Sequence, residues 1–157
     1  KTAVLPAACL KTGALIAGAP DDQAALLYRF GEAIGLAFQL RDDFLDAFGE
    51  SEVFGKKTGG DIRENKKTWL YIKALEAAPA ALRQELLELY ASQPSDPSEK
   101  IERVKSVFTE LGVDELARQE MQGLYQQAFT LMDGIQVAQD KKEPLTALAR
   151  GLFDRKN

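Results

Sequence analysis

Apolar residues recur along most of the chain with the three-and-four spacing of amphipathic helices. No run of β-branched residues alternates with polar residues over the length of a strand. The clearest stripe predicts a long helix that Asp21 or Asp22 caps and that continues through Phe48. That stripe consists of Leu26, Leu27, Phe30, Ile34, Phe38, Phe44 and Leu45. The pattern therefore predicts an all-α protein.

Proline, glycine and capping residues divide the remainder into further helices. Four glycines between positions 49 and 60 predict a loop that carries Lys56, after which Asp61 is placed to cap the next helix. A second loop is predicted at Gln93–Pro97. With no repeat or composition break, we expect residues 1–157 to form a single all-α segment. The other predicted helices cover 2–17, 61–78, 80–91, 98–111, 114–139 and 143–155.

The charge and the cysteine content of the chain limit which binding partners and which cellular compartment we expect. The net charge is -4 and the pI is near 5.0, so the chain lacks the basic surface of a nucleic-acid-binding protein. No apolar run reaches the roughly 18 residues of a membrane span. The single cysteine, Cys9, has small apolar neighbours and is expected to be a buried residue rather than a reactive thiol. We expect a cytoplasmic protein.

Histidine is absent from the sequence. Its absence excludes Ser-His-Asp and Cys-His nucleophiles, histidine-containing zinc hydrolase motifs and the Glu-x-x-His helices of di-iron bundles. Catalysis by this chain would therefore depend on carboxylates, lysines, amides or a bound metal.

Three aspartates lie at the end of the long predicted helix. Asp42 and Asp46 are four residues apart and share one helix face, while Asp43 lies on its flank. A hard divalent cation would relieve their mutual repulsion, and Mg²⁺ in particular shares its coordination between carboxylates and substrate phosphates. The same spacing also fits a solvated acidic turn, and the cluster alone does not decide between the two interpretations.

Lysines follow the aspartates along the chain. Lys56 lies in the glycine-rich loop, and Lys66 lies five residues after Asp61. An ammonium group is a point charge suited to a phosphate oxygen, although each lysine alone fits a solvated surface equally well. The ordered set of carboxylates and lysines predicts a site where Mg²⁺ and lysine bind a diphosphate.

The motifs FQLRDDFLD at 38–46, GK at 55–56, GGDI at 59–62 and NKKT at 65–68 resemble those of the trans-isoprenyl diphosphate synthases, the polyprenyl synthetases. The first corresponds to the second aspartate-rich motif of that family. The resemblance implies antiparallel helices around a deep cavity. It also implies a reaction in which isopentenyl diphosphate attacks the carbocation formed from an allylic diphosphate.

The resemblance also implies roles for the acidic residues. Asp42 would ligate a Mg²⁺ ion that bridges to the allylic diphosphate. Asp46 and Asp61 would support this metal through water, and Asp43 is the weaker candidate ligand.

Further roles are implied for residues that contact the substrates. Lys56 would contact the diphosphate, with Lys66 nearby as a second substrate-binding lysine, while Phe38 and Gln39 would face the reacting isoprenoid carbons. Of the residues matched so far, Asp42, Gln39 and Lys56 would be the catalytic ones.

The family has a Lys-Thr pair upstream of its Phe-Gln, and this sequence contains two candidates. Lys1 lies 37 residues before Phe38, whereas Lys11 lies 27 residues before it. We assign Lys1 and Thr2 to this catalytic and substrate-binding role, because Lys11-Thr12 falls a helical segment too late.

The resemblance reaches only the C-terminal half of the family's fold. The family's first DDxxD, which precedes everything matched here, is not in the sequence. We therefore expect a fragment that is inactive alone, from a parent that is a homodimer with a short-chain product such as geranyl, farnesyl or geranylgeranyl diphosphate.

Two other functions remain open from the sequence. A class I terpene cyclase shares the fold but typically has an Asn/Asp–Ser/Thr–Glu motif where this chain has DDxxD. A non-catalytic helical subunit of a prenyl synthase would be expected to lose aspartates or lysines of the second motif, and these residues are present.

Overall fold

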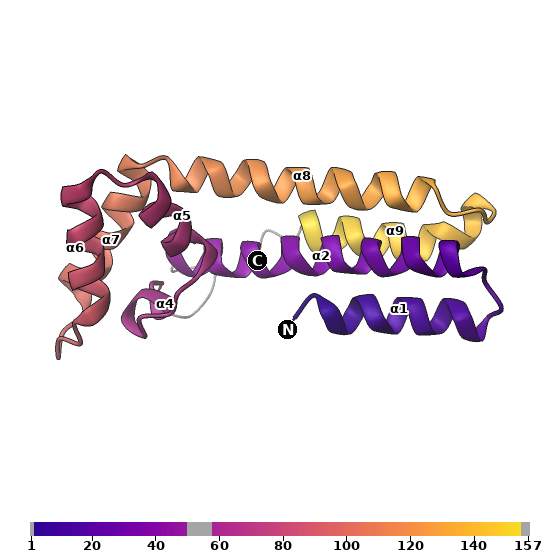
Figure 1. The fold of residues 1–157 in the computed structure, drawn as a ribbon, viewed down its shortest axis with the longest axis horizontal. Coiled ribbons are helices and arrows are strands. Elements are labelled where there is room, and N and C mark those ends of the chain that lie inside the picture. Colours follow the sequence, from indigo (N-terminus) through magenta and orange to yellow (C-terminus); the bar gives the residue numbers. More distant parts are fainter. Residues whose placement is uncertain (1, 50–57, 155–157) are drawn as a thin grey trace. The chain divides into compact units, whose positions relative to one another are not determined.

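The computed structural model describes residues 2–49 and 58–154, and every regular element in those ranges is an α-helix (Figure 1). The predicted all-α fold is therefore confirmed. None of the helices described is long and apolar enough to cross a membrane. The helices are α1 Val4–Ile16, α2 Asp21–Phe48, α4 Gly60–Arg63, α5 Trp69–Ala77, α6 Ala80–Ala91, α7 Ser98–Glu110, α8 Val113–Asp133 and α9 Gln139–Asp154.

The residues group into two compact units. The first joins the chain up to Gln39 with the chain from Glu120 onward, and contains α1, most of α2, most of α8, and α9. Successive helices of this unit run in opposite directions (Figure 1). Their apolar faces, which follow the predicted stripe in α2, form one core. Its buried members are Phe30, Ala33, Ile34, Ala37, Tyr125, Ala128, Leu131, Met132, Ile135 and Ala149.

Small residues bring α1 and α2 into close contact within the first unit. A Cβ atom at Gly35 would lie 2.5 Å from the Cα of Ala3, and one at Gly31 would lie 2.7 Å from the Cα of Ala7. Ala3 and Ala7 are buried, whereas Cys9 is exposed. The prediction of a buried cysteine is wrong, because position 9 is two residues, or about 200° of helix rotation, from the alanine that faces α2.

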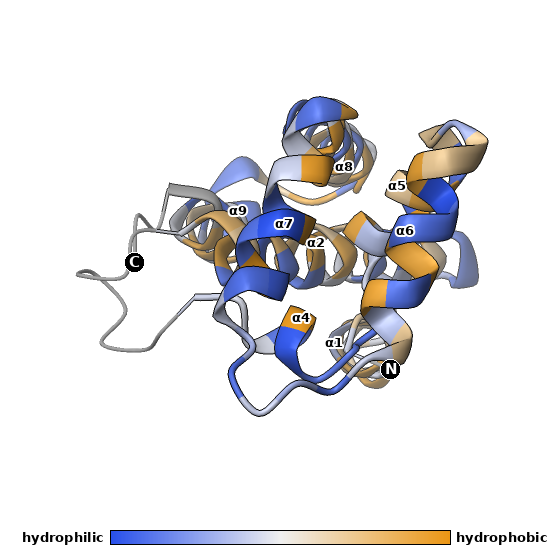
Figure 2. Cartoon of the chain, turned by 90° about the vertical axis from the view of Figure 1, so that its left-hand side faces the viewer, coloured by the Kyte–Doolittle hydropathy of each residue, from blue (hydrophilic) through white to orange (hydrophobic). Residues whose placement is uncertain are grey.

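The second unit, Leu40–Gln119, contains the end of α2, the helices α4 to α7 and the start of α8. Along α6, hydrophobic and hydrophilic residues alternate in bands (Figure 2). The rings of Tyr71 and Tyr90 stack with centroids 3.9 Å apart. The largest fully buried side chains belong to this unit; they are Phe108, Leu70, Leu86, Val104, Val107 and Val113.

The predicted helix over 61–78 is in fact two helices, α4 and α5. Asn65 adopts a left-handed conformation with φ 55°, which ends α4, and Thr68 caps α5 by accepting the N–H of Tyr71 at 3.4 Å. Gly59, with φ 88°, rather than Asp61, occupies the N-cap position of α4. The sequence did not predict this break, because a helix end in the left-handed conformation is usually recognised by a glycine, and here an asparagine adopts that conformation instead.

The boundary between the last two helices also differs from its prediction. Helix α8 ends at Asp133, before the predicted end near 139, and the Nζ of Lys142 donates to the Asp133 carbonyl at 3.0 Å. Helix α9 begins at Gln139 and includes Pro144, which was predicted to lie at the helix start. At the other end of the chain, α2 begins at Asp21, so the predicted capping aspartates lie inside its first turn.

A bidentate ion pair joins α6 and α7. The Nε and Nη2 atoms of Arg103 lie 2.5 and 2.7 Å from the two carboxylate oxygens of Glu85. These hydrogen bonds hold the pKa of Glu85 below its ordinary value.

The pair makes the stability of the protein depend on pH. Because the folded-state pKa of Glu85 is lowered, its stabilisation is present above the unfolded pKa and is lost as pH falls through the folded one. We expect Arg103→Gln to lower the unfolding temperature at neutral pH and to have less effect in acid, measured by thermal denaturation against pH. Arg83→Gln on the exposed side of α6 is the control; an equal effect of Arg103→Gln at both pH values would contradict the prediction.

Candidate functional site

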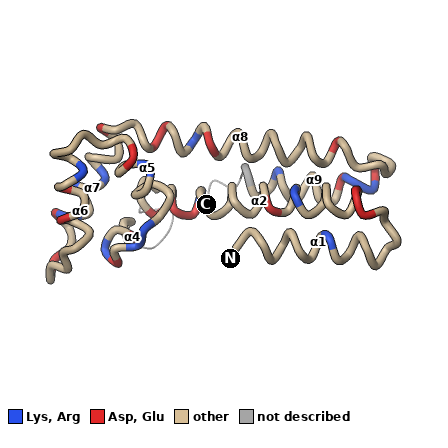
Figure 3. The backbone as a smooth tube through the Cα atoms, in the orientation of Figure 1, with Lys and Arg blue, Asp and Glu red and all other residues tan. Residues whose placement is uncertain are grey.

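The three predicted aspartates lie at the end of α2, in the second unit, where Figure 3 shows acidic residues. Their environments differ. Asp43 is 6% exposed, whereas Asp42 is exposed and Asp46 is half-buried. The residue placed on the flank of the cluster by sequence spacing is thus the most buried of the three.

Asp46 binds the N-terminus of α4. Its Oδ2 accepts the N–H of Asp61 at 2.8 Å, and its Oδ1 accepts the N–H of Gly60 at 3.2 Å. The backbone carbonyl of Asp46 also accepts the N–H of Gly59 at 2.6 Å. Burial raises the pKa of Asp46, and the two backbone hydrogen bonds oppose that rise. Asp46 therefore attaches α4 to α2 and places Asp61 next to the cluster.

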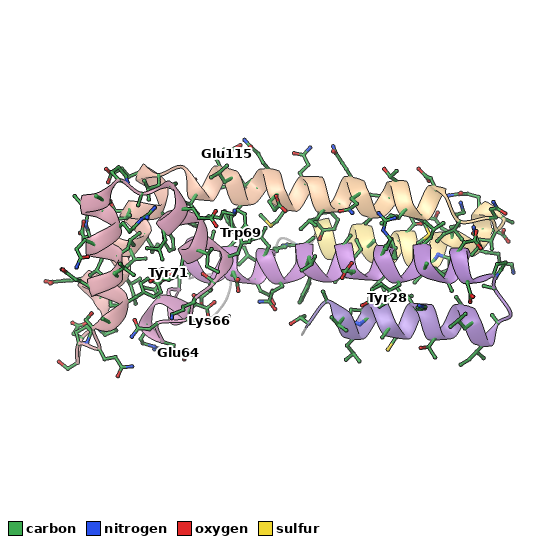
Figure 4. The ribbon with its side chains drawn as sticks, viewed as in Figure 1. Tyr28, Glu64, Lys66, Trp69, Tyr71 and Glu115 are labelled. Carbon is green, nitrogen blue, oxygen red and sulfur yellow. The ribbon has the colours of Figure 1, made fainter. Side chains whose placement is uncertain are left out.

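Lys66 connects two of the carboxylates. Its Nζ lies 2.9 Å from Oδ2 of Asp61 and 3.4 Å from Oδ1 of Asp43. The hydrogen bond with Asp61 is the main reason that the pKa of Lys66 is raised, so the ammonium form is favoured. Figure 4 labels Lys66 in the connection after α4; its side chain is half exposed. The arrangement places a cation and two anions at one edge of the unit.

The carboxyl group of Asp42 lies beside Asp43 and within the influence of the cations Lys66 and Arg41. Partial desolvation of its carboxyl group raises its pKa, and the neighbouring charge of Asp43 raises it further. A cation would favour the ionised form of this carboxylate, and carboxylate oxygens are the donors that Mg²⁺ prefers. Within ranges 2–49 and 58–154, no group of three or more Asp, Glu, Cys or His side chains converges as a complete metal site. A divalent cation at Asp42 would therefore need further ligands from a bound substrate or from water.

The predicted substrate-contacting residues are placed as follows. In the first unit, the Oγ1 of Thr2 donates to Oε1 of Gln39 at 2.9 Å, although the two residues are 37 positions apart. Phe38 is half-buried. Lys1 and Lys56 lie outside the described residues. The Thr2–Gln39 contact brings together two positions that the sequence related only through the family resemblance.

Two residues near the cluster were not predicted as functional. Asn65 precedes Lys66, and its side chain bonds to Lys100 on α7. Lys100 is buried and shares the apolar face of α7 with Val104 and Val107. In the sequence, Lys100 precedes Val104 by four residues and Val107 by seven, which places it on the apolar face of the helix. This spacing is the signal that could have identified it.

Comparison with known proteins gives the family. The sequence profile of the family described as polyprenyl synthetase matches residues 1–110. The short chain isoprenyl diphosphate synthase of Methanothermobacter thermautotrophicus is 44% identical over 92 residues, which cover 59% of this chain and 28% of that protein.

Solved structures agree with the family match. A geranylgeranyl pyrophosphate synthase superposes with a TM-score of 0.87 and 40% identity, over 100% of this chain and 49% of the other. The geranylgeranyl pyrophosphate synthase of Corynebacterium glutamicum, solved with calcium and isoprenyl diphosphate, gives a TM-score of 0.80 and 29% identity over 100% and 48%. The chain spans about half the length of these two solved proteins. With a family profile matched over most of its residues, the chain belongs to the polyprenyl synthetase family.

Proposed function

We propose that the full-length protein is a trans-prenyltransferase that condenses isopentenyl diphosphate with an allylic diphosphate, and that this chain supplies its second aspartate-rich motif. One observation carries the proposal most directly. The Lys66 ammonium lies between Asp43 and Asp61, beside an Asp42 carboxyl whose pKa burial raises. Such a pairing of a fixed cation with a neighbouring carboxylate suits a diphosphate bound together with a divalent cation.

Mg²⁺ is the proposed cofactor, and Asp42 is its proposed direct ligand. Asp43 is the weaker candidate because Lys66 lies against it. Asp46 and Asp61 are proposed to act through water, which agrees with the two backbone N–H groups that already occupy Asp46. When bound, Mg²⁺ would neutralise negative charge on the diphosphate. A relative from Corynebacterium glutamicum has been solved with calcium and isoprenyl diphosphate, which supports the use of a divalent cation.

The lysines are proposed to bind the diphosphate. Ionisation of an allylic substrate develops negative charge on the leaving diphosphate, and fixed ammonium groups stabilise this charge where it forms. Lys66 is held near the cluster by Asp43 and Asp61 before any substrate arrives, so little reorganisation is needed. Lys56 and Lys1 are proposed to add two further ammonium groups.

Thr2, Phe38 and Gln39 are proposed to contact the isoprenoid. The hydrogen bond between Thr2 and Gln39 fixes the amide of Gln39 on α2. An amide oxygen so oriented presents partial negative charge, which favours a nearby carbocation. Phe38 is half-buried, and an aromatic face attracts a cation.

The proposal includes the assembly and location of the full-length protein. We propose that the full-length protein is a cytoplasmic homodimer. We also propose that this chain alone does not catalyse the reaction, because its sequence contains one DDxxD motif. Exposed apolar side chains on α1, including Leu5 at 69% and Ile16 at 83%, support its burial against further protein.

The test is an assay of the full-length protein with Mg²⁺, isopentenyl diphosphate and each of dimethylallyl, geranyl and farnesyl diphosphate. We expect an elongated prenyl diphosphate from at least one allylic substrate and none when Mg²⁺ is chelated. Absence of any product from all three would contradict the proposal and favour a non-catalytic subunit. Cyclisation of an allylic substrate without isopentenyl diphosphate would instead indicate a terpene cyclase.

A further inference from the structure

Lys100 occupies an unfavourable position for a cation. It lies in the first turn of α7, at the positive end of the helix dipole, and is 5% exposed. Its Nζ donates to the carbonyl oxygen of Ser92 at 2.9 Å and to the Oδ1 of Asn65, and both acceptors are neutral. Burial accordingly lowers the pKa of Lys100. No carboxylate in ranges 2–49 and 58–154 pairs with this ammonium, and a buried cation without such a partner is costly, so its hydrogen bonds are the feature to explain.

These hydrogen bonds fix the side chain of Asn65 from both ends. While Oδ1 accepts from Lys100, the Nδ2 of Asn65 donates to the Ser92 carbonyl at 3.1 Å. Lys100, Asn65 and Ser92 thus form a closed triangle of contacts, which we call the Lys100 bridge. The bridge joins the connection between α4 and α5 to the end of α6 and the start of α7.

The backbone of Asn65 is in the left-handed region, with φ 55°. Asparagine visits this region at a modest energetic cost, so neighbouring contacts decide whether it stays there. At this position, the contacts are those of the Lys100 bridge and a backbone hydrogen bond to the Ile62 carbonyl at 3.1 Å. The bridge therefore stabilises the turn that ends α4.

The turn at Asn65 directs the next residue, Lys66. Because the chain reverses at Asn65, the N–H of Lys66 reaches the Asp61 carbonyl at 2.9 Å, and its Nζ reaches the Asp61 carboxylate at the same distance. An extended conformation at Asn65 would direct both groups elsewhere. The position of the Lys66 ammonium thus depends on the conformation of Asn65.

We propose that Lys100 is a positioning residue for the diphosphate site, which acts through Asn65 to hold Lys66 between Asp43 and Asp61. Lys100 itself touches no substrate. The inference rests on the proposed function only in that the ligand of Lys66 is a diphosphate.

The test is a double-mutant cycle in the full-length protein, with inorganic diphosphate and Mg²⁺ as the probe and calorimetry as the measurement. We expect Lys100→Met to weaken diphosphate binding about tenfold, a typical effect of a residue that orients a ligand. In the Lys66→Ala background, the same substitution is expected to change affinity less than about twofold, since coupled residues are non-additive. A purely structural role would give the same loss in both backgrounds and would overturn the inference.

Lys105→Met is the matched control, because Lys105 lies on the same helix and pairs with Glu102 rather than with Asn65. Its diphosphate affinity is expected to equal that of the unsubstituted protein. If Lys100→Met does not fold, Asn65→Ala replaces it, because this substitution removes the bridge from the other side and leaves a residue that seldom adopts the left-handed conformation. The same dependence on Lys66 is expected.

A second measurement separates this inference from the proposed function. The full-length protein is labelled at asparagine alone, and the signals of Asn65 are assigned by their loss in Asn65→Gln. In Lys100→Met, the H–N–Cα–H coupling of Asn65 is expected to leave its left-handed value; an unchanged coupling would overturn the inference. Failure of the unsubstituted protein to bind diphosphate would contradict the proposed function and leave this readout intact.

Discussion

Substitution of Asp42 by asparagine in the full-length protein is expected to lower kcat for prenyl transfer by about a hundredfold or more, the scale seen when one preorganised charge-stabilising group is lost. The change keeps the size of the side chain and removes its negative charge. Asp42 is the exposed carboxylate of the cluster, and no hydrogen bond to α4 competes for it as for Asp46. Steady-state kinetics at several Mg²⁺ concentrations measure the effect.

The dependence on Mg²⁺ distinguishes a metal ligand from a general electrostatic role. For Asp42→Asn, we expect the Mg²⁺ concentration at half-maximal rate to rise together with the loss of kcat. Asp21→Asn, an exposed carboxylate in the first turn of the same helix, serves as the control and should retain the original rate. A near-normal rate for Asp42→Asn would show that the metal assignment is wrong.

Substitution of Gly35 by alanine is expected to destabilise the protein by about 2 to 3 kcal/mol, because it overpacks a backbone contact. The new Cβ would lie 2.5 Å from Cα and 2.9 Å from Cβ of Ala3. A main-chain atom cannot rotate away as a side chain can, so α1 must move from α2. The hydrogen bond between Thr2 and Gln39 would then lengthen, since Thr2 adjoins Ala3. Chemical denaturation measures the loss of stability.

Gly123 provides a matched control for Gly35. It lies inside α8, and a Cβ atom there would meet nothing within 4 Å. Gly123→Ala is expected to stabilise the protein by about 0.5 to 1 kcal/mol, the usual gain for alanine over glycine in a helix. A neutral or stabilising Gly35→Ala would contradict the close contact between α1 and α2.

Most of the helices could be predicted from the sequence because each has its own periodicity and an end signal. Helix α6 was predicted at its observed bounds, between Pro79 and the polar loop that follows Ala91. The failures occur where tertiary contacts set the boundary. Asn65 interrupts a predicted helix, and its side chain is hydrogen-bonded to Lys100, 35 positions later. Such long-range contacts leave no local pattern.

The sequence predicted which residues belong to the candidate site better than it predicted how those residues are arranged. Charge spacing and the family resemblance brought Asp43, Asp61 and Lys66 into one hypothesis, and the structure places these side chains in contact. Periodicity could not rank the burial of Asp42 and Asp43, because adjacent residues on a helix differ by about 100° and the neighbours of α2 determine which is covered.

The two hydrogen bonds from α4 to Asp46 affect how the DDxxD pattern should be understood across a family. Asp46 accepts the amides of Gly60 and Asp61, whereas Asp42 is exposed. Selection on the last aspartate would then act through the folding of the following segment, and selection on the first through chemistry. A motif search that gives the three aspartates equal weight therefore does not separate the requirement for folding from the requirement for chemistry. If Asp42 is the metal ligand that we propose, a homologue that had lost only its first aspartate would keep the contact between α2 and α4 and lose the reaction.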